Sequence, residues 1–236
     1  MNILVNGSSF SRGPGSWPYI VQRTLDSELV NLSVAGAGTT YIHETTISEL
    51  AQRNYDLTII MWPPFDRVDF KVKDIEPFNG TIYNSLNQSL RNDWPDKVIW
   101  PVNDQDYVEK DWIFGCGYLN GETDANLRAA FDGYYKNTDR SQQFYSSLIR
   151  VISLQSFLKS IGMPYLFTFA RQFRQLARFD HLYTLLDWDN IHEVDLQSIC
   201  RENKWFDPDG VHPGPQAYEY YANNVVEHLR NQGSIK

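Results

Sequence analysis

One histidine of this chain lies in a turn that could hold it as a general base. The segment Asp209-Gly210-Val211-His212-Pro213 is rich in turn-forming residues, and Asp209 precedes His212 by three positions. A carboxylate at that separation can orient the imidazole and fix which ring nitrogen carries the proton. The structural alternative is that Asp209 caps a helix start and His212 lies on the surface. The other histidines lie in helical or undistinguished surroundings: His43, His181, His192 and His228.

A serine near the N-terminus is the candidate nucleophile. Ser9 follows the apolar run Ile3-Leu4-Val5 and the turn residues Asn6-Gly7-Ser8, which is typical of a short buried strand of a parallel sheet. Its hydroxyl would lie at the carboxyl end of that strand. A serine needs a base within hydrogen-bond reach to act as a nucleophile, so Ser9 taken alone could equally be the cap of a turn.

The elements that would position these groups alternate in type along the chain. Apolar runs ended by turn residues predict strands over about 3–5, 29–34, 56–62 and 164–169. Helical spacing of apolar residues predicts helices over about 17–29, 42–51, 144–161, 194–200 and 216–230. This alternation predicts an α/β fold with a mostly parallel sheet, whose sites lie in the loops at the carboxyl ends of the strands. The loops that follow the first three predicted strands contain Gly7-Ser8-Ser9, Gly36-Ala37-Gly38 and Pro63-Pro64.

The alternation is lost between about residues 65 and 139. This stretch is rich in aromatic residues and in turns, and we interpret it as an insertion within a single domain that spans residues 1–236. Trp94, Trp100 and Trp112 could stack on sugar faces there, or they could form a small core of their own.

Length and charge narrow the classes of function. A chain of 236 residues is predicted to form one decorated domain. Its 21 basic and 29 acidic residues make a net charge of −8, which argues against a nucleic-acid partner. No secretory signal or apolar run of membrane-spanning length is present, so we expect a cytoplasmic protein in which Cys116 and Cys200 are free thiols rather than a disulfide. The oligomeric state is left open.

Taken together, these motifs resemble the SGNH (GDSL-like) hydrolases. Gly7-Ser8-Ser9 is a variant of the family's Gly-Asp-Ser, Gly36 follows the second strand, and the Asp209–Pro213 block precedes the last helix. The resemblance implies a flavodoxin-like three-layer α/β/α fold and a serine esterase that needs no cofactor or metal. It also implies Ser9 as nucleophile, His212 as general base and Asp209 as its partner. The backbone N–H groups of Ser9 and Gly36 would bind the oxyanion, with Gly38 as a rival for Gly36.

The third block departs from the family's pattern. The SGNH hydrolases have Gly-x-Asn-Asp after the third strand, where the asparagine donates to the oxyanion. This chain has Pro63-Pro64 instead, and proline offers neither a side-chain donor nor a backbone N–H. Losing one such donor typically lowers turnover by ~100- to 1,000-fold. Arg67, or Asn103 of the insertion, could supply the missing donor.

Two hypotheses from different classes therefore follow. The first is an esterase that cleaves a small-molecule or glycan ester, such as an acetyl group on a carbohydrate. The second is a catalytically reduced descendant of the fold that binds a glycan or a protein, because fold alone does not settle function. A nucleotide- or flavin-binding protein is disfavoured, since Gly36-Ala37-Gly38 lacks the third glycine of a dinucleotide fingerprint.

Overall fold

A five-stranded parallel sheet forms the centre of the computed structural model, which describes residues 1–65, 67–71, 112–115, 133–134, 136–171 and 177–235. The strands lie in the order β2-β1-β3-β6-β7, which is the flavodoxin-like order. Their bounds are β2 (Glu28–Asn31), β1 (Asn2–Asn6), β3 (Leu57–Trp62), β6 (Tyr165–Phe169) and β7 (Ile191–His192). Every pair within this sheet is parallel, so the predicted α/β fold is confirmed.

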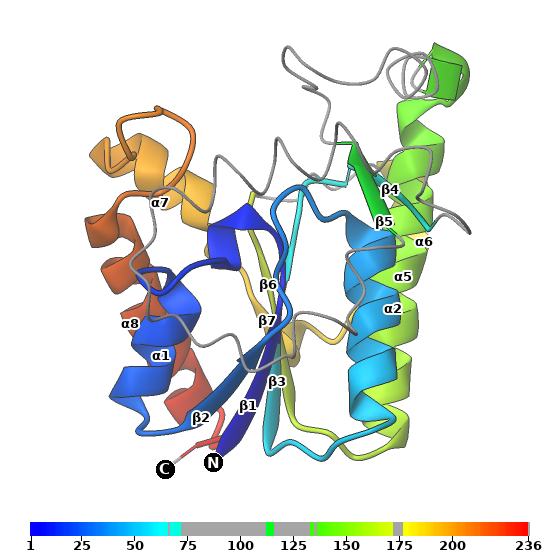
Figure 1. The fold of residues 1–236 in the computed structure, drawn as a ribbon. Coiled ribbons are helices and arrows are strands. Elements are labelled where there is room, and N and C mark those ends of the chain that lie inside the picture. The colour runs from blue at the N-terminus through cyan, green and yellow to red at the C-terminus, as the bar shows by residue number, and fades with distance from the viewer. Residues whose placement is uncertain (66, 72–111, 116–132, 135, 172–176, 236) are drawn as a thin grey trace.

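Helices cover both faces of the sheet (Figure 1). On one face lie α1 (Trp17–Thr24), α7 (Leu196–Asn203) and α8 (Pro215–Asn231). On the other lie α2 (Thr39–Leu50) and α5 (Arg140–Ser160), with the short α6 (Asp180–Tyr183) nearby. Among the described helices, none is long and apolar enough to cross a membrane.

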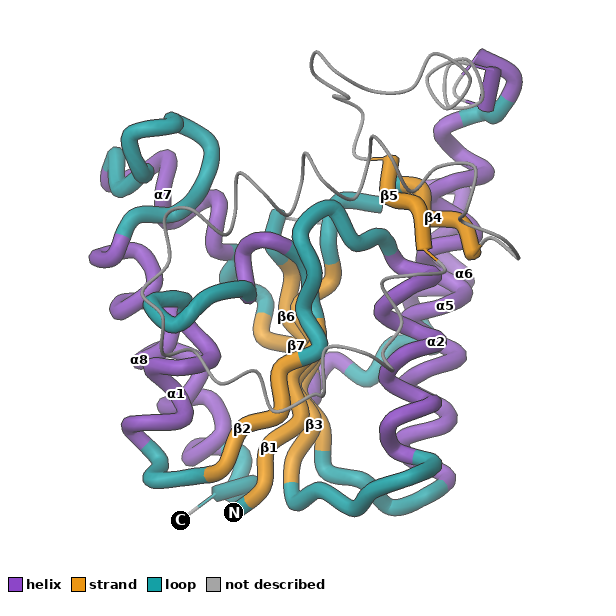
Figure 2. The backbone as a smooth tube through the Cα atoms, in the orientation of Figure 1, coloured by secondary structure: helices purple, strands orange, loops and turns teal. Residues whose placement is uncertain are grey.

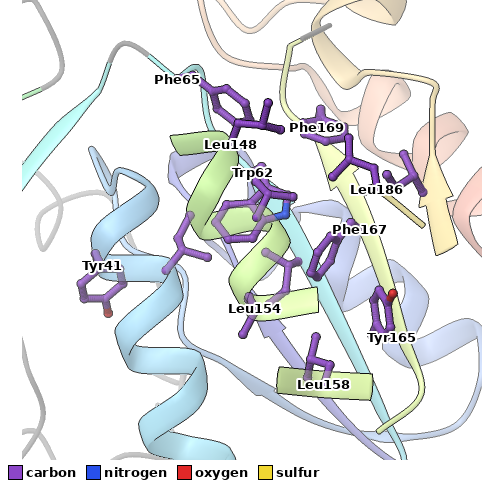
Figure 3. Packing of buried hydrophobic residues seen from close by; sticks show 14 of the residues in the cluster. Tyr41, Trp62, Phe65, Leu148, Leu154, Leu158, Tyr165, Phe167, Phe169 and Leu186 are labelled. Atoms are coloured by element: carbon purple, nitrogen blue, oxygen red, sulfur yellow. The ribbon is translucent and has the colours of Figure 1, made fainter. Parts of the chain in front are cut away.

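Each face of the sheet has its own apolar core, because the strands of a parallel sheet are covered on both sides. On the α1 and α8 side, the buried rings of Trp17 and Tyr221 meet edge to face with centroids 5.7 Å apart. On the α2 and α5 side, Trp62 packs against Phe167 in the same way, at 5.5 Å. Figure 3 shows this second core, in which Leu148 and Leu154 of α5 lie over β3 and β6.

The predicted elements are present with shifted ends. The second strand stops at Asn31 rather than residue 34, because the Asn31 side chain turns back to accept the backbone N–H of Ser33 at 3.0 Å. The first helix ends at Thr24 rather than near Leu29, shortly before Asp26 adopts a positive φ of 45°. Gly162, with a φ of 66°, follows the end of α5. The sequence did not predict β7, which has two residues.

Two short strands are described within the predicted insertion. β4 (Val68–Lys71) and β5 (Trp112–Gly115) pair antiparallel, with Asp69 opposite Phe114. Figure 2 shows this pair beside the start of α2, at the end of the molecule opposite the N-terminus. Trp94, Trp100, Asn103 and Cys116 lie outside the described residues, and the assignment of 65–139 to one insertion in a single domain stays a prediction.

Candidate active site

The loop before α8 holds an imidazole against a carboxylate. Nδ1 of His212 lies 2.5 Å from Oδ2 of Asp209, and both side chains are partly exposed. The other carboxylate oxygen, Oδ1, accepts the backbone N–H groups of Val211 at 2.8 Å and of His212 at 2.9 Å. The Asp209 side chain therefore shapes the turn and orients the ring at the same time. Since Nδ1 is engaged, Nε2 is the nitrogen left to exchange a proton.

The backbone around this pair is closed by hydrogen bonds on both sides. The N–H of Asp207 donates to the carbonyl of His212, and the N–H of Gly214 donates to the carbonyl of Trp205, each at 2.8 Å. Gly210, at the tip, has a φ of 69°, a conformation that glycine adopts without steric cost. The turn residues noted in the sequence thus form a closed hairpin-like loop that presents His212.

The surroundings keep Asp209 ionised. Partial burial alone would raise its pKa, but the hydrogen bonds from the His212 ring and from two backbone N–H groups outweigh burial and lower the pKa to about 2. At neutral pH the His212 ring therefore has an anion beside it. An imidazolium formed during a reaction would be stabilised by that charge.

The segment after β1 meets this loop. Ser8 precedes a short 3₁₀ turn, η1 (Ser9–Ser11), and the ring of Phe10 lies edge to face with the His212 ring, at 5.6 Å between centroids. Ser8 is fully buried, whereas Ser9 is partly exposed. The fold thus brings the neighbour of Ser9 into contact with His212, although among the described residues no hydrogen bond joins the Ser9 hydroxyl to that ring. The complete Ser9–His212–Asp209 relay stays a prediction.

Buried polar contacts fix where β1 ends. The side-chain amide of Asn6 donates to the Thr45 hydroxyl at 2.8 Å and the Thr46 hydroxyl at 3.0 Å, which ties β1 to α2. A Cβ at Gly7 would lie 2.6 Å from the Ser11 hydroxyl oxygen, so a side chain at this position would require Ser11 to move. The end of β1, which precedes Ser9 in the chain, is therefore closely packed.

The loop after β2 places Gly36 next to the same strand end. The N–H of Val34 donates to the carbonyl of Gly7 at 3.3 Å, and the N–H of Ala37 closes a turn onto Val34 at 3.2 Å. Gly36 has a φ of 84°, which suits the third position of a type II turn and favours glycine. Within the described part of the chain, the backbone N–H groups of Ser9 and Gly36 have no acceptor. Gly38 differs, because its N–H donates to Asp69 at 2.9 Å.

The segment after β3 contributes contacts that the sequence did not predict. Pro63 and Pro64 follow the strand, as in the sequence, and Arg67 directs its guanidinium at the Ala37 carbonyl, 3.4 Å away. Asp69, buried in β4, accepts backbone N–H groups at the start of α2. Burial raises the pKa of Asp69, against the lowering effect of those N–H donors and of Arg150. No regular sequence pattern marks this role, since Arg67 follows a turn closed onto Pro64 and only Asp69 lies within β4.

Other candidate sites are few among the described residues. No group of three or more histidine, cysteine, aspartate or glutamate side chains there could hold a metal ion. Cys200 is a buried free thiol, and burial, as the largest cause, raises its pKa to about 11. A thiol in that state is a poor nucleophile at neutral pH.

Known proteins match this chain through structure alone: neither a family model nor a curated protein matches its sequence. The esterase EstA from Pseudoalteromonas sp. superposes with a TM-score of 0.53 at 11% identity, over 99% of both chains. TesA superposes with a TM-score of 0.53 at 13% identity, over 98% of this chain and 99% of its own. A two-domain esterase active on acetylated mannans superposes with a TM-score of 0.50 at 13% identity, over 100% of this chain and 50% of its own.

These likenesses show that the chain shares its fold with these proteins. The α/β/α architecture implied by the resemblance to the SGNH hydrolases is therefore confirmed for the described residues.

Proposed function

We propose that this protein hydrolyses carboxylic esters, with Ser9 as nucleophile, His212 as general base and Asp209 as the partner that orients His212. The observation that supports it most is the hydrogen-bonded Asp209–His212 pair lying against Phe10, the residue that follows Ser9. Phe10 and His212 come from opposite ends of the chain and are in contact at the carboxyl edge of the sheet.

The reaction follows from the chemistry of these groups. The Ser9 hydroxyl oxygen attacks the ester carbonyl carbon while Nε2 of His212 takes the hydroxyl proton. The tetrahedral intermediate collapses when the departing alcohol oxygen receives that proton, which leaves an acyl group on Ser9. Water then attacks the acyl carbon with His212 again as base, which releases the carboxylic acid and restores the serine.

The oxyanion of the intermediate would be bound by the backbone N–H groups of Ser9 and Gly36. Both belong to loops that are held together by the Val34–Gly7 hydrogen bond. Arg67 is the better-supported candidate for a further donor, because its guanidinium reaches the loop that contains Gly36. Asn103 is the alternative donor, and it lies outside the described residues.

For the substrate we propose a small acyl group, such as acetyl, on a carbohydrate. The support is the similar fold of an esterase active on acetylated mannans. Two assays test this choice. One measures acetate release from an acetylated oligosaccharide, and the other measures the rate of hydrolysis of p-nitrophenyl esters whose acyl groups have two to eight carbons. A rate that increases with acyl length would contradict it.

Labelling with a fluorophosphonate probe tests the catalytic serine. The wild type should be labelled and Ser9→Ala should not, whereas the matched control Ser8→Ala, at a buried hydroxyl without a partner among the described residues, should be labelled normally. His212→Ala should lose labelling too, and His181→Ala, at an exposed histidine of α6, should keep it. Folded wild type that takes no label and hydrolyses no ester would favour the reading as a binding module.

A further inference from the structure

We propose that Asp69 is a positioning residue for the oxyanion-binding loop: with Arg67, it holds Gly36–Tyr41 in place from the segment where the SGNH hydrolases have their asparagine. This inference rests on the proposed function, because it assigns a role in the same site. The inference does not propose a ligand site at the start of α2, because the Asp69 carboxylate already accepts the backbone N–H groups there.

The contacts of Asp69 are concentrated on one short stretch. Its Oδ2 accepts the backbone N–H groups of Gly38 at 2.9 Å and Tyr41 at 2.7 Å, and its Oδ1 accepts that of Thr40 at 3.2 Å. Such N–H groups at the start of a helix lack acceptors within the helix. A carboxylate there is stabilised by the helix dipole and by hydrogen bonds to an ionised acceptor, which are stronger than neutral ones.

The neighbours of Asp69 hold the same stretch. The Arg67 guanidinium donates to the Ala37 carbonyl. The Ser147 hydroxyl of α5 lies 3.1 Å from the Thr39 hydroxyl and donates to the Phe65 carbonyl at 3.3 Å. The chain after β3 therefore contacts the loop directly through Arg67 and Asp69, and Phe65 is linked to it only through Ser147.

The loop is consequently restrained on both sides of Gly36. Before it, the Val34–Gly7 hydrogen bond joins the loop to β1, and after it Arg67 and Asp69 hold Ala37 and Gly38. A backbone donor stabilises an oxyanion only when it is aimed before the reaction begins. The segment that lost a donor residue would thus still serve catalysis, by fixing the direction of the Gly36 N–H.

Gly38 shows how closely Asp69 approaches. A Cβ at this position would lie 3.0 Å from the carboxylate carbon and from both of its oxygens. The backbone of Gly38 has a φ of −100°, so alanine would be tolerated there apart from this contact. Gly38→Ala would therefore displace Asp69 by a few tenths of an ångström without straining the backbone.

The test compares Asp69→Asn with Asp195→Asn. Asp195 is an equally buried aspartate that caps α7 by accepting the Ser198 N–H at 2.8 Å, away from the loop. Asp69→Asn should lower kcat for p-nitrophenyl acetate by about 10- to 100-fold with KM unchanged, since misplaced donors weaken transition-state binding. Asp195→Asn should leave kcat within about twofold of the wild type. Equal kcat values for the two variants would overturn the inference.

Hydrogen–deuterium exchange and a second variant complete the test. Amides 38, 40 and 41 should exchange faster in Asp69→Asn than in Asp195→Asn, and unchanged exchange there would overturn the inference even without an activity assay. If Asp69→Asn does not fold, Gly38→Ala should lower kcat, while Gly15→Ala, where a Cβ meets nothing within 4 Å, should not. An inactive wild type would overturn the proposed function and this inference together, whereas an active wild type with unaffected variants would overturn the inference alone.

Discussion

Two aspartates at the same end of the sheet have opposite surroundings. The Asp209 side chain is 49% exposed, lies beside His212, and has its pKa lowered to about 2. Asp69 is 6% exposed, contacts backbone N–H groups, and has its pKa raised by burial. The pKa of an exposed carboxyl group depends mainly on the hydrogen-bond donors and charges beside it. The pKa of a buried one depends also on the loss of hydration, which disfavours the charged form.

The comparison separates two ways in which a carboxylate can serve a site. Asp209 can stabilise a charge that appears on a neighbouring ring, because it is itself charged at neutral pH. Asp69 is better suited to hold a backbone segment, because three hydrogen bonds from one stretch restrain it. We expect substitutions of Asp209 to lower the catalytic rate with little change in the free energy of unfolding. Substitutions of Asp69 should lower both.

The largest expected effect is on the rate at Asp209. Asp209→Asn should lower kcat by about 10,000-fold, because an amide no longer selects the ring tautomer that leaves Nε2 as a base. Steady-state hydrolysis of p-nitrophenyl acetate measures it. Asp139→Asn, at an exposed aspartate that caps α5, is the control and should retain the wild-type rate. A comparable loss in both variants would remove the distinction between Asp209 and an ordinary cap.

The next effect concerns acid stability and a histidine away from both aspartates. His192 of β7 lies against the rings of Tyr221 and His228 of α8, and burial, with the His228 charge, lowers its pKa to about 4. The unfolded chain, where a histidine has a pKa near ~6.5, therefore binds the proton more readily. The free energy of unfolding should fall by up to about 3 kcal/mol as the pH decreases from ~6.5 to ~4.

Urea denaturation at a series of pH values measures this loss. His192→Phe should flatten the dependence, and His181→Ala, at an exposed histidine, should not change it. An unchanged slope in His192→Phe would show that other groups cause the acid sensitivity.

A smaller effect is the difference between Asp69 and Asp209 in their contribution to the free energy of unfolding. Asp69→Ala should lower the free energy of unfolding by about 2–3 kcal/mol, because the N–H groups of Gly38 and Tyr41 lose a buried acceptor. Asp209→Ala should cost less than about 1 kcal/mol, since its contacts are exposed and screened by solvent. Urea denaturation at pH 7 compares them, and the reverse order would contradict the assignment of Asp69 to a structural restraint on the loop.

The smallest expected effect is on the pH dependence of kcat/KM. On the acidic side, kcat/KM should increase with pH, because a general base must be unprotonated to accept the serine proton. Asp209, with a pKa of about 2, stays ionised throughout and adds no second step. Unfolding measured in parallel identifies any loss caused by His192 instead. A rate that increases as His212 becomes protonated would rule out its role as general base.

Part of this site could be predicted from short stretches of sequence. The Asp209–His212 contact spans three positions, and Gly36 lies in a turn that only a few residue types adopt, so both follow from local chemistry. Asp69 could not be found in this way. It lies 31 positions from Gly38, in a region without regular periodicity, and its contacts exist because β4 packs beside α2. The sequence also provided no sign that His192 is buried, because its contacts are with α8, a distant segment of the chain.

The alternation of apolar runs and helical patterns by itself determined four of the five strands of the parallel sheet, the five longest described helices and the loops able to do chemistry, because period and turn residues act locally. Tertiary packing alone decided that Phe10 touches His212, that Gly38 gives its N–H to Asp69, and that His192 is buried against α8. Contacts between distant segments depend on how the helices pack against the faces of the sheet, and no single stretch of the sequence determines that packing.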